Sequence, residues 1–259
     1  MNIVRIGAAL ACAAAVAGCV HTAEPLLAST AIVAEFPLQS GPQVAAARFS
    51  AERVGTPPRS WEPFVVSPSA KPTHYRLIDA NAGVALEATA EGAASGLYRR
   101  IRIDPARYPV VEWRWRVLRA PAHSDPRLPA RDDSPARLVI CFHGDVSRLD
   151  IGERFTAQMY KSLTGSRLPY AMLMYVWAND APVETVAASN YTSKIQMIVV
   201  DGGSVGEWRE FRRNIVEDYR RAFGEDPWDI VAVGVMSDTD NSRAQARTLY
   251  GDITLRPEK

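Results

Sequence analysis

The sequence contains few of the residues that most often carry enzymatic chemistry. Among its 259 residues there are only 4 histidines and 3 cysteines. The histidines are His21, His74, His123 and His143, and none is spaced with cysteines or carboxylates as a zinc site requires. No Gly-x-Ser-x-Gly, His-Glu-x-x-His, phosphate loop or dinucleotide fingerprint is present. We therefore do not expect metal-dependent hydrolysis through histidine.

The sequence also lacks an excess of charge of either sign. It has 30 basic and 29 acidic residues, and its formal net charge is +1. A balanced chain exerts no long-range attraction on nucleic acid, so we expect no nucleic-acid partner. The hydrophobic content of 47% is enough for a folded domain with its own core.

The N-terminal residues have the pattern expected of a targeting signal. A short basic start with Arg5 precedes the apolar stretch 6–17, which is too short to span a bilayer as a helix. The following Val16-Ala17-Gly18-Cys19 resembles the lipobox of bacterial lipoproteins. The alternative is an ordinary secretory signal in which the cysteine falls at this place by chance.

The resemblance to a lipobox implies that the mature protein is lipidated and anchored to a membrane. Residues 1–18 would be removed as a lipoprotein signal peptide, and Cys19 would carry diacylglycerol and acyl chains such as palmitate. Val20 follows in place of an aspartate, which implies sorting to the outer membrane, facing the periplasm. Two or more acyl chains make a stable anchor, so the protein would be tethered to the membrane without spanning it.

The remaining chain divides into a tether and one domain. The tether is expected at 19–48, because this segment is rich in alanine and proline, and a single domain is expected at 49–259. Once Cys12 is removed and Cys19 is acylated, only Cys141 remains, so no intramolecular disulfide can form. Cys141 lies within an apolar run at 138–142, which predicts a buried side chain in a strand.

Short alternating runs separated by turn residues predict a mainly β fold. The clearest run is 111–117, where Trp113 and Trp115 share one face while Arg114 and Arg116 share the other with Glu112. About nine or ten such strands without βαβ alternation predict an antiparallel two-sheet β-sandwich of jelly-roll type. We expect the tryptophans inside; the alternative is that they form a sugar-stacking platform and the arginines point inward.

Two short amphipathic helices are also predicted. The first lies between Gly152 and Gly165, where apolar residues recur every four positions at Phe155, Met159 and Leu163. The second begins at Ser204, which has capping-box spacing to Glu207, and ends at Gly224. Its expected apolar stripe consists of Trp208, Phe211, Ile215 and Tyr219.

Seven short motifs occur in an order that resembles a known bacterial family, the domain of unknown function numbered 3047. The similarity extends from about Trp61 to Leu255. The family's name records no activity, so the resemblance carries over no catalytic residue. The motifs are Ser95-Gly-Leu, Glu112-Trp-Arg-Trp-Arg-Val117, Asp132-Asp-Ser-Pro-Ala-Arg137, Tyr175-Val-Trp-Ala178, Arg213-Asn-Ile-Val-Glu-Asp-Tyr-Arg220, Ala222-Phe-Gly224 and Asp238-Thr-Asp-Asn241.

The stretch Asp238-Thr-Asp240-Asn241 is the main candidate site. Its oxygen-bearing side chains are typical of a turn that ends a strand, and they also suit calcium, with Asp238 and Asp240 as the ligands. No other cofactor is expected. A third alternative is a catalytic pair of carboxylates that cleaves a glycan, formed by Asp240 and a partner such as Asp133 from another strand.

The leading functional hypothesis is a non-catalytic binding domain for envelope glycan or an envelope protein. Arginine forks bind carboxylates and hydroxyls in pairs, which suits acidic sugars. An alternative for Arg114 and Arg116 is an internal ladder of ion pairs with Asp132 or Asp133. The residues expected to contact a ligand are Arg114, Arg116, Asp133, Arg137, Asp238, Asp240 and Asn241.

Overall fold

A computed structural model describes residues 36–55, 58–81, 83–164, 167–203 and 205–258. The predicted signal peptide, Cys19 and Ser204 lie outside the described residues, as does the side chain of Leu163. In the part of the chain that is described, no helix is both long and apolar enough to cross a bilayer.

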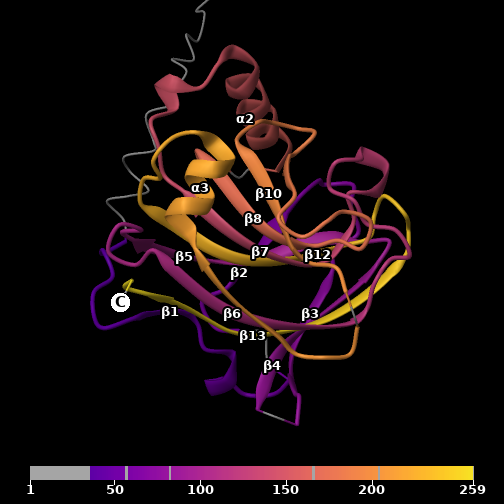
Figure 1. The fold of residues 1–259 in the computed structure, drawn as a ribbon. Helices are drawn as coiled ribbons and strands as arrows, with labels where there is room; N and C mark the ends of the chain where they lie inside the picture. Colours follow the sequence, from indigo (N-terminus) through magenta and orange to yellow (C-terminus); the bar gives the residue numbers. More distant parts are fainter. Residues whose placement is uncertain (1–35, 56–57, 82, 165–166, 204, 259) are drawn as a thin grey trace, which may run out of the picture.

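Two β-sheets face each other and form a β-sandwich, as predicted (Figure 1). The six-stranded sheet has the order β11 (Arg209–Asn214), β6 (Val110–Arg119), β13 (Gln245–Arg256), β4 (Val84–Glu91) and β3 (His74–Asp79), and β1 (Val44–Ala47) also pairs with β13. The seven-stranded sheet has the order β2 (Glu62–Val65), β5 (Ala94–Ile103), β12 (Ile230–Asp238), β7 (Ser134–Phe142), β8 (Ala171–Trp177), β10 (Ile195–Asp201) and β9 (Val186–Ala188). The helices are α2 (Ile151–Thr164) and α3 (Ile215–Phe223), with 3-10 turns at Phe49–Ala51, Pro129–Arg131 and Val146–Arg148.

Strand β6 confirms the alternation predicted for it. Trp113 and Trp115 are 4% and 0% exposed and belong to the core between the sheets. The Trp113 ring stacks on Tyr175 of the opposite sheet at a centroid distance of 5.0 Å, and such aromatic pairs add to the stability gained by burial. Two buried indoles cannot stack on a sugar, so the platform alternative is wrong.

The seven-stranded sheet departs from the predicted antiparallel pattern at one pair. Strands β8 and β10 run parallel, with Ile195 opposite Met172. A parallel pair needs a long connection, and residues 178–194 supply it while contributing β9 to the sheet edge. The chain passes so closely after β10 that a Cβ atom at Gly202 would lie 1.8 Å from the carbonyl oxygen of Ala178. Only glycine fits there.

Both edges of the seven-stranded sheet are short. Strand β2 has four residues, including Pro63, and among the described residues it pairs with β5 alone. Strand β9 has three residues, and its one partner in the described chain is β10. Proline has no N–H to donate, which is why it is tolerated in an edge strand.

The second predicted helix is wrong in its first half. Residues Arg209–Asn214 form β11, which pairs with β6 and places Phe211 beside Trp113 with ring centroids 4.9 Å apart. Helix α3 begins after Asn214, whose side chain accepts hydrogen bonds from the N–H groups of Val216 and Glu217. It ends at Gly224, as predicted, in the left-handed conformation with φ 71°.

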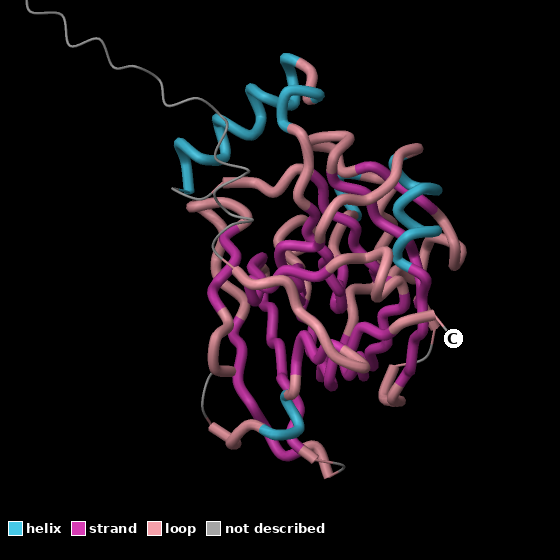
Figure 2. Tube along the Cα trace, turned by 90° about the vertical axis from the view of Figure 1, so that its left-hand side faces the viewer, coloured by secondary structure: helices cyan, strands magenta, loops and turns pink. Residues whose placement is uncertain are grey.

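Helix α2 is confirmed, but the described side chains of its apolar stripe are exposed. Phe155 and Met159 are 65% and 48% exposed, and Ile151 is 86% exposed. Figure 2 shows this helix projecting beyond the strands. An exposed apolar stripe of this kind is unusual in a soluble domain.

Cys141 lies in β7, as predicted, and is a free cysteine. The residue is half-buried, not fully buried as predicted, and desolvation of its thiol raises the pKa of that group to about 12. A thiol in this state is not a nucleophile at neutral pH.

Candidate functional site

The predicted turn follows β12 directly. Asp238 is the last residue of the strand, and residues 240–243 form a turn that leads into β13. The N–H of Thr239 donates to the carbonyl of Ala93 at 2.8 Å, which holds the start of this turn against the neighbouring β4–β5 connection. The turn interpretation of Asp238 to Asn241 is therefore confirmed.

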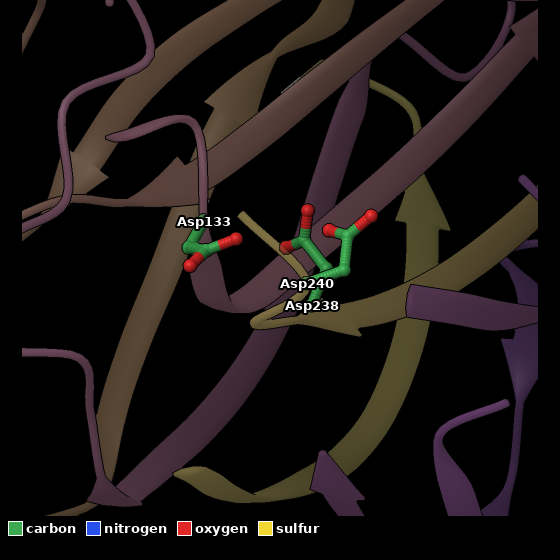
Figure 3. A group of neighbouring side chains, drawn as sticks. All are labelled: Asp133, Asp238 and Asp240. Atoms are coloured by element: carbon green, nitrogen blue, oxygen red, sulfur yellow. The ribbon is translucent and has the colours of Figure 1, made fainter. Parts of the chain in front are cut away.

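Three carboxylates converge at this turn (Figure 3). Asp133, Asp238 and Asp240 each place one oxygen atom within 4.8 Å of the other two. The 238–240 segment leaves β12, and Asp133 immediately precedes β7, the strand that pairs with β12. Antiparallel pairing places the end of one strand beside the start of the other, which brings together residues about a hundred positions apart.

Asp238 is held in a buried ion pair with Arg137. The Nε and Nη2 atoms of Arg137 donate to the two Asp238 oxygens at 3.1 and 3.0 Å, and Nη2 also donates to Oδ1 of Asp132 at 3.0 Å. The side chains of Arg137 and Asp238 are 4% and 7% exposed. Burial lowers the pKa of Arg137, but the charges of Asp238 and Asp132 outweigh it and raise that pKa above its usual range.

The pKa of Asp238 is subject to opposing influences. Burial raises it to about 7, while the Arg137 charge acts to lower it. A guanidinium does not lose its proton in a protein, so a neutral Asp238 would deprive a buried cation of one of its two carboxylate partners. We therefore treat the two side chains as an ion pair at neutral pH.

Asp133 holds the turn itself. Its Oδ1 accepts from the N–H of Asn241 at 3.1 Å, and its Oδ2 accepts from the N–H of Ser242 at 2.8 Å and from the Ser242 hydroxyl. Asn241 contributes its backbone N–H to this turn, and a contact between its side chain and a ligand stays a prediction. Asp133 is 1% exposed, and a buried carboxylate needs such donors.

Asp240 differs from the other two carboxylates because it lies at the surface. Burial of part of the group and the charge of Asp133 raise its pKa. A full calcium shell needs six to eight oxygens, and Asp133 and Asp238 already use theirs for internal hydrogen bonds. Calcium binding through Asp238 and Asp240 stays a prediction, and it would have to compete with Arg137.

Two of the predicted ligand residues lie elsewhere. Arg114 and Arg116 belong to β6 of the six-stranded sheet, and the Arg114 guanidinium stacks over the Trp208 ring at 4.7 Å. The Nε of Arg116 is buried without a hydrogen-bond partner among the described residues. The predicted ladder of these arginines with Asp132 or Asp133 is wrong, because Asp132 pairs with Arg137 and Asp133 binds the turn.

Asp240 lines a cleft of about 700 Å³ at this end of the sandwich. The cleft lies where the β12–β13 turn meets the β4–β5 turn, the segment before β3, and the β9–β10 loop. Tyr191, from the last of these, is 75% exposed. The polar and aromatic residues of the lining are Ser67, Ser69, Lys71, Glu91, Tyr191, Asp240, Arg243 and Gln245.

Sequence reasoning missed most of this cleft. Lys71, Glu91 and Tyr191 are far apart along the chain and belong to no motif. The one available signal was the position of Tyr191, a large aromatic residue within the polar run Ser189-Asn-Tyr-Thr-Ser193. An aromatic side chain in such a loop is a candidate contact for a ligand.

The sequence matches the family described as "Protein of unknown function (DUF3047)" over residues 59–254, which is most of the chain. The chain belongs to this family. No curated protein matches the sequence at a significant level.

Three solved structures align with most of this chain at TM-scores below 0.5. The xyloglucanase domain of NopAA from Sinorhizobium fredii is 5% identical with a TM-score of 0.42, and the alignment covers 85% of this chain and 100% of that one. Endoglucanase 3 of Trichoderma harzianum is 9% identical, with a TM-score of 0.39 and coverage of 85% and 100%. The K1 adhesin domain of Lys-gingipain from Porphyromonas gingivalis is 10% identical, with a TM-score of 0.37 and the same coverage. Similarity at this level says nothing about activity.

Proposed function

We propose that this DUF3047 protein is a non-catalytic, glycan-binding lipoprotein of the outer membrane. Cys19 would carry the lipid anchor, and the cleft beside Asp240 would bind carbohydrate of the cell envelope in the periplasm. The observation that supports glycan binding is the composition of the cleft, which combines an exposed aromatic ring with carboxylate, amide, hydroxyl and cationic side chains.

This combination fits the chemistry of a sugar. A pyranose has apolar C–H faces, which pack on an aromatic ring, and hydroxyl groups at its rim, which both donate and accept hydrogen bonds. Tyr191 offers the ring, while Asp240 and Gln245 offer acceptors, and Gln245 and Arg243 offer donors. The buried network of Asp133, Arg137 and Asp238 fixes the turn that carries Asp240, so these residues would act by positioning.

Binding is tested by a thermal-shift screen of the protein with peptidoglycan and polysaccharide fragments. A ligand at 100 times its dissociation constant adds about 2.7 kcal/mol to the free energy of unfolding. We expect Tyr191→Ala to abolish the shift. The matched control is Trp228→Ala, because Trp228 is 45% exposed but lies outside the lining of the cleft. If no glycan shifts the melting temperature, the binding proposal is wrong.

The lipid anchor is tested separately. Cells expressing the wild-type protein should incorporate a labelled lipid precursor into it, whereas cells expressing Cys19→Ala should not. Labelling of both proteins, or of neither, would contradict the anchor.

One observation favours the alternative of a carboxylate-dependent glycan-cleaving enzyme. The pKa of Asp240 is raised, which is the direction that a general acid requires. Within the cluster, its natural partner Asp133 is less suited, because both Asp133 oxygens bind the turn. In this alternative, Asp240→Asn would abolish product release from a panel of glycans while leaving binding intact. If no glycan releases product with the wild-type protein, cleavage is ruled out for that panel.

A further inference from the structure

The cleft beside Asp240 continues into a second one. A smaller cleft of about 260 Å³ shares two lining residues, Lys71 and Glu91, with the larger. These two side chains form an ion pair with an Nζ to Oε2 distance of 3.8 Å, and both are more than half exposed. The pair therefore stands at the boundary where the two clefts adjoin.

The floor of the second cleft is the polar face of the β3–β4 hairpin. His74 lies opposite Thr89 and Arg76 lies opposite Glu87 in the antiparallel register. Side chains of directly paired residues project from the same face of a sheet, so all four line the cleft together. His74 is exposed and Thr89 is half-buried, which leaves both in reach of a ligand.

The charges of the joined clefts cancel. Lys71, Arg76 and Arg243 carry positive charge, and Glu87, Glu91 and Asp240 carry negative charge. Some of this charge is also neutralised in place, because Glu87 accepts from Arg76 at 2.6 Å and from Arg247 at 2.7 Å. A surface that attracts polyanions or polycations carries an excess of one sign, which is not the case here.

We infer that the ligand is an uncharged, linear oligosaccharide that lies across both clefts. One end packs against Tyr191, the middle passes the Lys71–Glu91 pair, and the far end meets His74 and Thr89. This inference rests on the proposed glycan-binding function and specifies its substrate class. It replaces the expectation of acidic sugars, because Arg114 and Arg116, on which that expectation depended, do not line either cleft.

The test is calorimetric titration of the full chain in detergent micelles. The probes are neutral oligosaccharides of glucose and of N-acetylglucosamine, from one to six units, and anionic oligogalacturonates of the same lengths. We compare the wild-type protein with Tyr191→Ala and with the double variant His74→Ala/Thr89→Ala. Both second-cleft substitutions remove side chains outside the core, so we expect the double variant to keep the wild-type fold.

Affinity for a neutral series should rise with length, and the six-unit ligand should bind about tenfold more tightly than the two-unit ligand, a difference of about 1.4 kcal/mol. The double variant should lose this gain while binding the two-unit ligand normally, whereas Tyr191→Ala should weaken both. Affinity should not change between low and high salt, because no net charge is neutralised.

Two outcomes would overturn the inference while leaving the proposed function standing. The first is tighter binding of oligogalacturonates, with affinity falling as salt rises. The second is equal affinity for short and long neutral ligands. If no saccharide of either class binds, the proposed function fails together with the inference.

Discussion

Removal of the Asp238 carboxylate should destabilise the fold strongly. In Asp238→Ala the Arg137 guanidinium loses the two hydrogen bonds that it donates to Asp238. It keeps its contacts with Asp132, whose carbonyl and carboxylate oxygens lie 2.6 and 3.0 Å from Nη2. The Arg137 side chain is 4% exposed, so water cannot replace the lost partner. Breaking a buried ion pair by removing one member costs about 3–5 kcal/mol. For a domain of this size that corresponds to a fall in melting temperature of about 6–20 °C.

The assay is urea unfolding followed by the fluorescence of the six tryptophans. The control is Glu62→Ala, which breaks the exposed ion pair with Arg100, whose side chains are 51% and 40% exposed; this should cost no more than about 1 kcal/mol. The double variant Arg137→Met/Asp238→Ala should be more stable than Asp238→Ala, because it removes the buried cation that the single variant leaves with Asp132 as its remaining carboxylate partner. A cost below about 1 kcal/mol for Asp238→Ala, or a double variant less stable than the single one, would refute this account.

Three further predictions concern other groups. Burial raises the pKa of Glu87, but hydrogen bonds and charges from Arg76 and Arg247 outweigh this effect and hold that pKa below its usual range. The stability gained from the ionised Glu87 is present above the unfolded pKa of about 4.3 and is lost as the pH falls through the folded pKa. Glu87→Gln should therefore reduce the loss of folding free energy that the wild-type protein shows as the pH is lowered. An unchanged loss in the variant would contradict this. If the turn binds calcium, the ion should raise the melting temperature, chelator should reverse the rise, and Asp240→Asn should abolish it; no response to calcium in the wild-type protein would end the calcium hypothesis. Cys141 should react with a thiol reagent at pH 8 only after unfolding, because its thiol has a pKa of about 12. Rapid labelling of the native protein would show that this thiol is accessible.

The burial of a strand was predictable from the sequence where apolar and polar residues alternate along that strand. In β6 each side chain alternates between core and surface, so the sequence alone indicates which face is buried. In the region 204–224 the local sequence pattern does not distinguish a strand from a helix. Phe211 fits both a helical stripe with Ile215 and an alternating strand with Arg209 and Arg213. Its pairing with β6 decides between them, and a partner strand far away in the sequence cannot be seen from the local pattern.

The candidate site was predictable only in part, for a similar reason. Asp133, Arg137 and Asp238 were selected for their chemistry, and the pairing of β7 with β12 brings them together. The same chemistry suggested Arg114 and Arg116, which the fold places on the other sheet. The cleft itself is made by turns from four parts of the chain, and its shape depends on how their ends meet. Residue type indicates what a side chain can bind, but tertiary structure decides which side chains share a ligand.

The short edge strands of the seven-stranded sheet limit how neighbouring molecules can associate. With a three-residue β9 on one side and a proline within β2 on the other, little free backbone is left to template the addition of a strand from a second molecule. For a protein that we propose to be concentrated in a membrane plane, where encounters between copies are frequent, these short edges disfavour strand addition between the seven-stranded sheets of neighbouring copies.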